Sequence, residues 1–195
     1  MPVRYHKRGA STAYDSLSVK TGAMDVLLRN MKAHNTILDA TLFISSRLES
    51  APAGTAGMAD PARAVKWMYD VTGQARELGV AVAAGTDGMS PGGPVEPPNI
   101  HRELELLVTR AGFEPIEAIS AATLNSARAI GIEKTTGTVS VGKAADLVIL
   151  TADPSADIRN TRAVELVVKG GAIFYRKAFL AGAGSGSAGA AAIGR

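Results

Sequence analysis

The stretch Gly85-Thr86-Asp87-Gly88 holds the residues with the clearest chemical potential, and it directly follows a short apolar run at residues 80–84. Such a run is typical of a buried strand, and ligand sites favour loops at the carboxyl ends of parallel strands. At such a place the carboxylate of Asp87 could bind a metal ion and accept a proton from a water molecule. The same residue could instead form an Asx turn that ends the strand. These residues alone leave both interpretations open.

The remaining candidates for chemistry are few, because the sequence has three histidines and no cysteine. His6 is expected to be exposed in a basic N-terminal segment, and His34 to satisfy carbonyl groups at the end of a helix. His101 follows the Pro/Gly-rich loop at residues 88–98, where it could line a substrate pocket or fix the loop by hydrogen bonds. The absence of cysteine excludes a disulfide framework and a thiol nucleophile.

Alternating helices and strands must position these residues. Asp25 is predicted to cap a short helix that ends at Asn35, before a predicted strand at residues 36–43. A second helix is predicted from the cap Asp60 and Pro61 to a left-handed stop at Gly79, before the strand at residues 80–84. Two such units in succession predict parallel pairing, with helices covering the sheet.

The second half changes from helices to short strands. Helices are predicted at residues 100–112 and 115–123, followed by a new cap at Asn125 and a stop at Gly131. Short strands are then predicted around residues 139–141 and at residues 147–150, 164–168 and 172–175. This pattern predicts a small β segment in the second half that is distinct from the α/β part before it.

Four stretches of the sequence resemble the C-terminal region of the amidohydrolase superfamily, and its imidazolonepropionase-like and prolidase-like members in particular. They are GTD at residues 85–87, HRELELLVTRAGFEPIEAISAATLNSARAIGI at 101–132, GTVSVGKAADLVILTADP at 137–154 and VELVVKGGAIF at 164–174. Their order and spacing carry the resemblance, which extends over residues 25–174.

The resemblance implies a (β/α)8 barrel with a site for one or two metal ions, and a β-sandwich assembled from both chain termini. It implies that Asp87 is the metal ligand and proton shuttle at the end of the last barrel strand, with a divalent metal, zinc above all, as cofactor of the full-length parent. Thr86, Gly88 and His101 are then expected to bind substrate. The family's HxH pair is absent, and residues 16–25 (SLSVKTGAMD) have no histidine where its sixth-strand ligand is expected.

The length of 195 residues argues for a partial barrel, because a complete (β/α)8 barrel alone takes about 250 residues. Together with this length, the resemblance implies an α/β fold with the last barrel strands and helices at residues 25–132 and the sandwich segment at residues 133–177. Residues 1–24 form an N-terminal segment, and residues 178–195 an Ala/Gly/Ser-rich tail that is expected to be disordered.

Two functional hypotheses follow. The first is the C-terminal fragment of a metal-dependent amidohydrolase that hydrolyses C–N bonds in a cyclic amide, amidine or dipeptide-like substrate. The second is a catalytically inactive remnant whose open sheet edges bind a complementing chain or a second copy. A metal titration, combined with activity assays on cyclic amides and dipeptides, would separate the two hypotheses.

Composition and charge restrict the partners. The net charge of +3 comes from basic residues spread along the chain, which argues against nucleic-acid binding. No apolar stretch approaches the roughly twenty residues of a membrane span, and no signal peptide is visible. The expected partner is a small-molecule substrate, and a soluble, cytoplasmic location is favoured.

Overall fold

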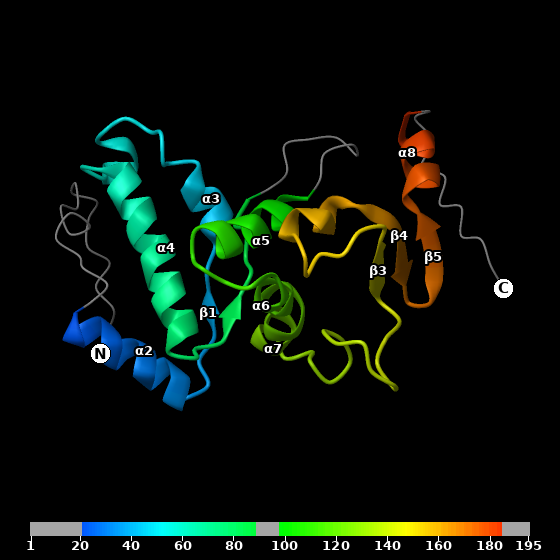
Figure 1. Cartoon of the computed structure of the whole chain (residues 1–195), viewed down its shortest axis with the longest axis horizontal. Coiled ribbons are helices and arrows are strands. Elements are labelled where there is room, and N and C mark those ends of the chain that lie inside the picture. The colour runs from blue at the N-terminus through cyan, green and yellow to red at the C-terminus, as the bar shows by residue number, and fades with distance from the viewer. Residues whose placement is uncertain (1–20, 89–97, 185–195) are drawn as a thin grey trace.

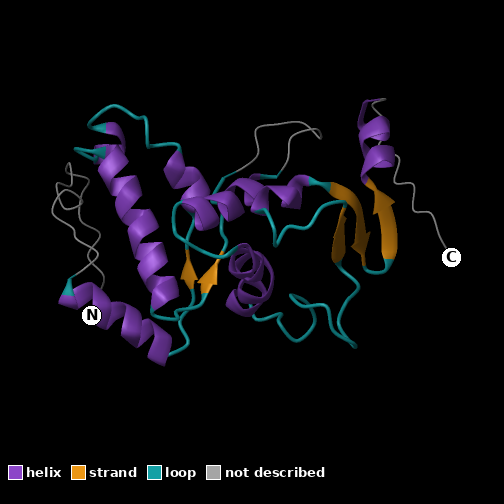
Figure 2. Cartoon of the chain, viewed as in Figure 1, coloured by secondary structure: helices purple, strands orange, loops and turns teal. Residues whose placement is uncertain are grey.

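Two helix-to-strand units make up the first half of the chain, and the second half begins with helices and continues into a three-stranded antiparallel sheet (Figures 1 and 2). The structure is a computed structural model, which describes residues 21–88 and 98–184. Its elements are α2 (Gly22–Ala33), β1 (Leu38–Asp39), α3 (Leu42–Ser46), η1 (Thr55–Gly57), α4 (Pro61–Glu77), β2 (Val82–Ala83), α5 (Asn99–Thr109), α6 (Pro115–Ser120), η2 (Ala121–Asn125), α7 (Ser126–Ala129), β3 (Leu147–Leu150), η3 (Ile158–Arg162), β4 (Val164–Lys169), β5 (Ala172–Tyr175) and α8 (Arg176–Gly184).

The helix α4 begins and ends where its sequence signals predict. The side chain of Asp60 accepts a hydrogen bond from the Arg63 amide at 3.0 Å, and Pro61 occupies the first helical position. Gly79 follows the helix with φ of +74°, a conformation that glycine adopts without steric cost. The prediction for this helix is therefore confirmed.

The strands β1 and β2 pair in parallel, as the alternation of elements predicts, but they are shorter than predicted. Leu38 pairs with Val82, and Asp39 with Ala83. The predicted strand at residues 36–43 is wrong beyond Asp39, because Thr41 adopts a left-handed conformation with φ of +50° and Leu42 begins α3. The predicted strand at residues 80–84 is likewise reduced to Val82–Ala83.

The helix α2 begins before the predicted cap. The side chain of Thr21 accepts a bond from the Met24 amide at 3.2 Å, so Thr21, and not Asp25, is the cap. At the other end, His34 Nδ1 lies 2.8 Å from the Asn30 carbonyl oxygen, as predicted for a side chain that satisfies late carbonyls.

The helix α5 lies at the centre of the molecule and contacts α3, α4, α6 and η3 (Figure 1). Its side chains Leu104, Leu106 and Leu107 are buried, and they share one apolar core with Leu42 of α3 and Val65 of α4. Burial of such aliphatic side chains contributes about 1.5–3 kcal/mol each. The packing joins α5 to α3 and α4 and, through η3, to the β segment.

The helical run from α6 to α7 does not restart at Asn125, so the predicted cap at that position is wrong. Asn125 has right-handed helical backbone angles, and the helical path continues through it from η2 into α7. Its side-chain amide instead donates to the Val82 carbonyl oxygen at 3.0 Å. The residue thus attaches this run to β2.

The β segment consists of β3, β4 and β5 in antiparallel order. The strand predicted around residues 139–141 is not formed: Val139 lies in an irregular stretch and Val141 in a turn, and both are exposed, at 86% and 107%. They follow Gly137 and precede Gly142, both with positive φ, which breaks any strand. The helix α8 covers residues 176–184, and the rest of the Ala/Gly/Ser-rich segment lies outside the described residues.

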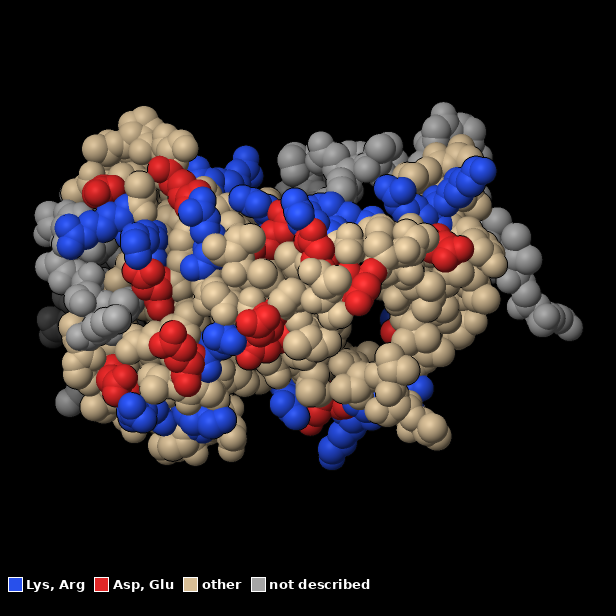
Figure 3. All heavy atoms as spheres, in the orientation of Figure 1, with Lys and Arg blue, Asp and Glu red and all other residues tan. Residues whose placement is uncertain are grey.

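Positive and negative side chains are interspersed over the face of the molecule in view (Figure 3). Among residues 21–88 and 98–184, no helix is both long enough and apolar enough to cross a membrane.

Candidate active site

The residue predicted to carry the chemistry, Asp87, lies four residues beyond the end of β2. It is exposed, and its backbone has φ of +41°. A positive φ is uncommon for a residue other than glycine, although aspartate tolerates it better than most. The carboxylate therefore stands at the carboxyl edge of a parallel strand, on a backbone whose conformation is held by its neighbours.

A second carboxylate, Asp39, ends the neighbouring strand β1 and fixes the exit of β2. Its Oδ1 atom accepts hydrogen bonds from the Gly85 amide at 2.8 Å and from the Thr41 hydroxyl at 3.3 Å. A Cβ atom on Gly85 would lie only 2.1 Å from the same oxygen, so this close approach requires glycine. Sequence reasoning missed Asp39, although it sits inside the predicted strand that is parallel to the one before Asp87.

The predicted substrate-binding residues Thr86 and Gly88 flank Asp87 on the same edge. The Gly88 carbonyl oxygen accepts a bond from the Asn99 side-chain amide at 2.9 Å. A Cβ atom on Gly88 would lie 2.7 Å from the Phe43 ring, so this ring closes one side of the backbone here. Thr86 is half-buried between these two anchored glycines. Their role in substrate binding stays a prediction.

The third predicted substrate-binding residue, His101, contacts the β segment. Its Nδ1 atom lies 3.1 Å from the hydroxyl of the buried Thr161 in η3. Burial, with the nearby Arg162 guanidinium, lowers the pKa of His101 from 6.5, which favours the neutral ring. This contact favours the interpretation that His101 fixes local structure, while a role in lining a substrate pocket stays a prediction.

Next to His101, an ionic cluster connects α5 to η3. The side chain of Glu105 is 12% exposed and pairs with both Arg102, at 3.0 Å, and Arg162. Because a buried carboxylate without partners is costly, the two guanidinium groups stabilise the packing of the β segment against α5.

The most deeply buried acid, Glu103, also escaped sequence reasoning. Its exposure is 0%, and its two carboxylate oxygens accept hydrogen bonds from the Leu42 amide, at 2.9 Å, and the Phe43 amide. Burial raises the pKa of Glu103 to about 7, an effect that the two backbone bonds oppose and the charge of Asp39 reinforces. Acids with a shifted pKa are common at functional sites, and Glu103 binds residues that closely follow Asp39 in the chain.

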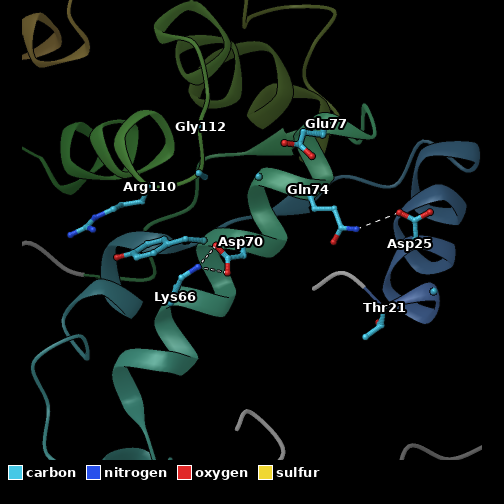
Figure 4. Close-up of a pocket in the computed structure, with 12 residues that line it drawn as sticks. Thr21, Asp25, Lys66, Asp70, Gln74, Glu77, Arg110 and Gly112 are labelled. Carbon is cyan, nitrogen blue, oxygen red and sulfur yellow. Dashed lines mark hydrogen bonds and ion pairs between the residues drawn. The ribbon is translucent and has the colours of Figure 1, made fainter. Parts of the chain in front are cut away.

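A cavity of about 800 Å³ lies elsewhere, between α2, α4 and the turn that follows α5 (Figure 4). Its polar lining is largely paired: Lys66 binds Asp70 at 2.6–2.7 Å, and the Gln74 amide approaches Asp25 at 3.4 Å. None of the predicted site residues lines this cavity. We therefore place the candidate active site at the edge that carries Asp39 and Asp87.

The donors at this edge do not make up a complete metal site. In residues 21–88 and 98–184, no group of three or more histidine, aspartate or glutamate side chains could hold a metal ion. A catalytic zinc site takes three protein ligands, with a further position left open for water. The described residues offer Asp87 as a single candidate ligand, and the others would have to come from outside them.

Comparison with known proteins identifies the relatives of this chain. A model of the amidohydrolase family matches residues 5–173. The ochratoxinase of Aspergillus niger is 39% identical over 102 residues, which cover 50% of this chain and 20% of that enzyme. The imidazolonepropionase of Symbiobacterium thermophilum is 40% identical over 106 residues, covering 52% of this chain and 24% of that enzyme.

Solved structures support the same relationship. The crystal structure of A. niger ochratoxinase superimposes with a TM-score of 0.66 and 31% identity, covering 77% of this chain and 35% of that one. A putative prolidase from Bifidobacterium longum gives a TM-score of 0.60 and 33% identity over 76% of this chain and 39% of that one. The chain thus spans about a fifth of the curated relatives that it matches, and 35–39% of these solved structures.

Proposed function

The chain belongs to the amidohydrolase family, and on this premise we propose that it forms the C-terminal part of a metal-dependent enzyme that hydrolyses C–N bonds. The observation that carries the proposal is the position of Asp87, which follows the carboxyl end of a parallel strand whose exit is bound by a second carboxylate, Asp39. Enzymes built on parallel strands and helices place their catalytic groups at this edge. The (β/α)8 barrel is part of the proposal, since two parallel strands alone do not form one.

The names of the relatives suggest the substrate class. They include an ochratoxinase, imidazolonepropionases and a Xaa-Pro dipeptidase. We propose that the substrate of the present protein is a small molecule with a cyclic amide, amidine or dipeptide-like C–N bond. In this assignment Asp87 would be one ligand of a divalent metal, which would supply an activated water, and would accept the proton of that water, while Thr86, Gly88 and His101 would contact substrate.

The alternative, an inactive remnant that binds a partner, is favoured by a different observation. The outer edge of β2 is occupied by the helical run: Asn125 donates to the Val82 carbonyl oxygen, and the Ala84 amide donates to the Ala121 carbonyl oxygen at 3.3 Å. Within residues 21–88 and 98–184, the other strand, β1, has a strand neighbour on one side only. A chain with one occupied and one open edge could stand alone and receive an extended segment of a complementing chain or of a second copy.

A chimera separates these functions. In A. niger ochratoxinase, the segment that matches this chain is replaced by the present residues, and the chimera is assayed for the hydrolysis performed by the parent enzyme. The proposal predicts that the purified, zinc-supplemented chimera hydrolyses the parent's substrate, because the missing ligands then come from the ochratoxinase portion.

The parent enzyme serves as the positive control, and circular dichroism establishes that the chimera is folded. A folded chimera with zinc in excess and no hydrolysis would contradict the catalytic proposal and support the remnant. In that case, sedimentation of the isolated chain would show whether it associates with itself.

A further inference from the structure

The buried carboxylate Glu103 is not used by the chemistry assigned to Asp87, and its surroundings suggest a different task. In the part of the chain that the structure describes, no ion pair with lysine or arginine is found for it. Its partners are the backbone amides of Leu42 and Phe43. A carboxylate taken from water costs several kcal/mol unless its oxygens are satisfied, so these two bonds are what holds it in the core.

The two amides lie immediately after the exit of β1. Residues 40–43 turn away from the strand, with Thr41 in the left-handed conformation and its hydroxyl bound to Asp39. Glu103 accepts hydrogen bonds from the two amides that follow Thr41 and thereby fixes the path of the chain beyond Asp39. The contact spans 60 and 61 residues of sequence, so it is purely tertiary.

The same helix also fixes the exit of β2. Asn99 lies four residues before Glu103, which places both side chains on one face of α5. The Asn99 side-chain amide binds the Gly88 carbonyl oxygen, and Phe43, whose amide binds Glu103, packs its ring against Gly88. One face of α5 thereby binds the two chain exits that carry Asp39 and Asp87.

We infer that Glu103 is a positioning residue, which sets the placement of Asp87 relative to Asp39 through Phe43 and Gly88. The role rests on the proposed function, because it acts on the carboxylate assigned there to the chemistry. Glu103 itself touches no reacting atom. It keeps the edge pre-organised, so that the two carboxylates hold their separation without being packed into the core themselves.

The test compares amide resonances of the isotope-labelled chain with those of Glu103→Gln. The variant removes one acceptor oxygen but keeps the size of the side chain. Amide exchange of Leu42 and Phe43 is expected to become up to about tenfold faster, the loss expected for one hydrogen bond. The resonances of residues 85–88 are expected to shift together with those of residues 42–43.

The matched control is Glu105→Gln, a second buried glutamate on the same helix, whose partners are Arg102 and Arg162. It should move resonances near η3 and leave residues 85–88 unchanged. Shifts in Glu103→Gln that end at residues 42–43, or equal shifts of residues 85–88 in both variants, would overturn the role of Glu103.

If Glu103→Gln does not fold, a pH titration of the unaltered chain provides the test. The amide resonances of Gly85 and Gly88 should follow the carboxyl resonance of Glu103 near pH 7, with the His101 ring resonance read separately. If the amide resonances of residues 85–88 do not shift as Glu103 is protonated, the inference is refuted. These measurements need neither metal nor substrate, so their failure leaves the chimera result standing, and the reverse also holds.

Discussion

Replacing Asp87 by asparagine in the ochratoxinase chimera is expected to lower kcat/KM by about 10²- to 10⁴-fold, the usual contribution of a positioned proton acceptor. Asparagine preserves the shape of the side chain and forms Asx turns as readily as aspartate. It also tolerates the positive φ of +41° at this position. The substitution therefore removes the proton-accepting carboxylate and leaves a turn function intact.

The control for this substitution is Asp153→Asn. Asp153 is an exposed aspartate between β3 and η3, and its Oδ1 atom accepts bonds from the amide and hydroxyl of Ser155 in an Asx-type turn. Hydrolysis should be unchanged in this variant. If Asp87→Asn is as active as Asp153→Asn, Asp87 is a turn residue and the catalytic assignment is wrong.

The second prediction with a large effect is that the free energy of unfolding falls by up to about 3 kcal/mol as pH rises from about 4.5 to about 7. Glu103 has a pKa of 4.5 in an ordinary setting and of about 7 when buried in the folded chain. Between these values the folded state binds more protons than the unfolded state. Stability is therefore greatest on the acid side of this window and is lost as pH rises through the folded pKa.

Denaturant unfolding at pH values from 5 to 8 measures this effect, and Glu103→Gln isolates it. The lowered pKa of His101, caused by burial and then by Arg162, acts in the opposite direction, because stability then increases as pH rises toward 6.5. Since the variant keeps His101, the difference between the two curves belongs to Glu103. Curves that run parallel over the whole range would show that Glu103 does not titrate in this window.

Local signals predicted the elements that depend on neighbouring residues. The limits of α4 were predicted from the cap at Asp60, the proline at position 61 and the glycine at position 79, and the structure has the same limits. The alternation of helices and strands also predicted parallel pairing of β1 and β2, and with it the placement of Asp87 beyond a parallel strand. The signals that end α4 act within one helix and need no knowledge of the rest of the chain.

The errors arise where distant contacts decide the backbone. The strand predicted at residues 36–43 stops at Asp39, and the amides of Leu42 and Phe43 donate hydrogen bonds to the distant Glu103. A glutamate in a helical pattern suggests an exposed side chain, so nothing in the sequence indicated its burial. Asn125 has the residue type of a cap, but its amide binds Val82 from within a continuous helical run. Asp39 was missed for the same reason, since its bond to Gly85 spans 46 residues.

The most direct test of the account is the position of the metal in crystals of the chimera grown with zinc. Anomalous scattering at the zinc edge should place an ion within about 2.2 Å of a carboxylate oxygen of Asp87, the usual length of a zinc–oxygen bond. The contradicting result is a zinc ion bound by the ochratoxinase portion alone, with the Asp87 side chain directed into solvent.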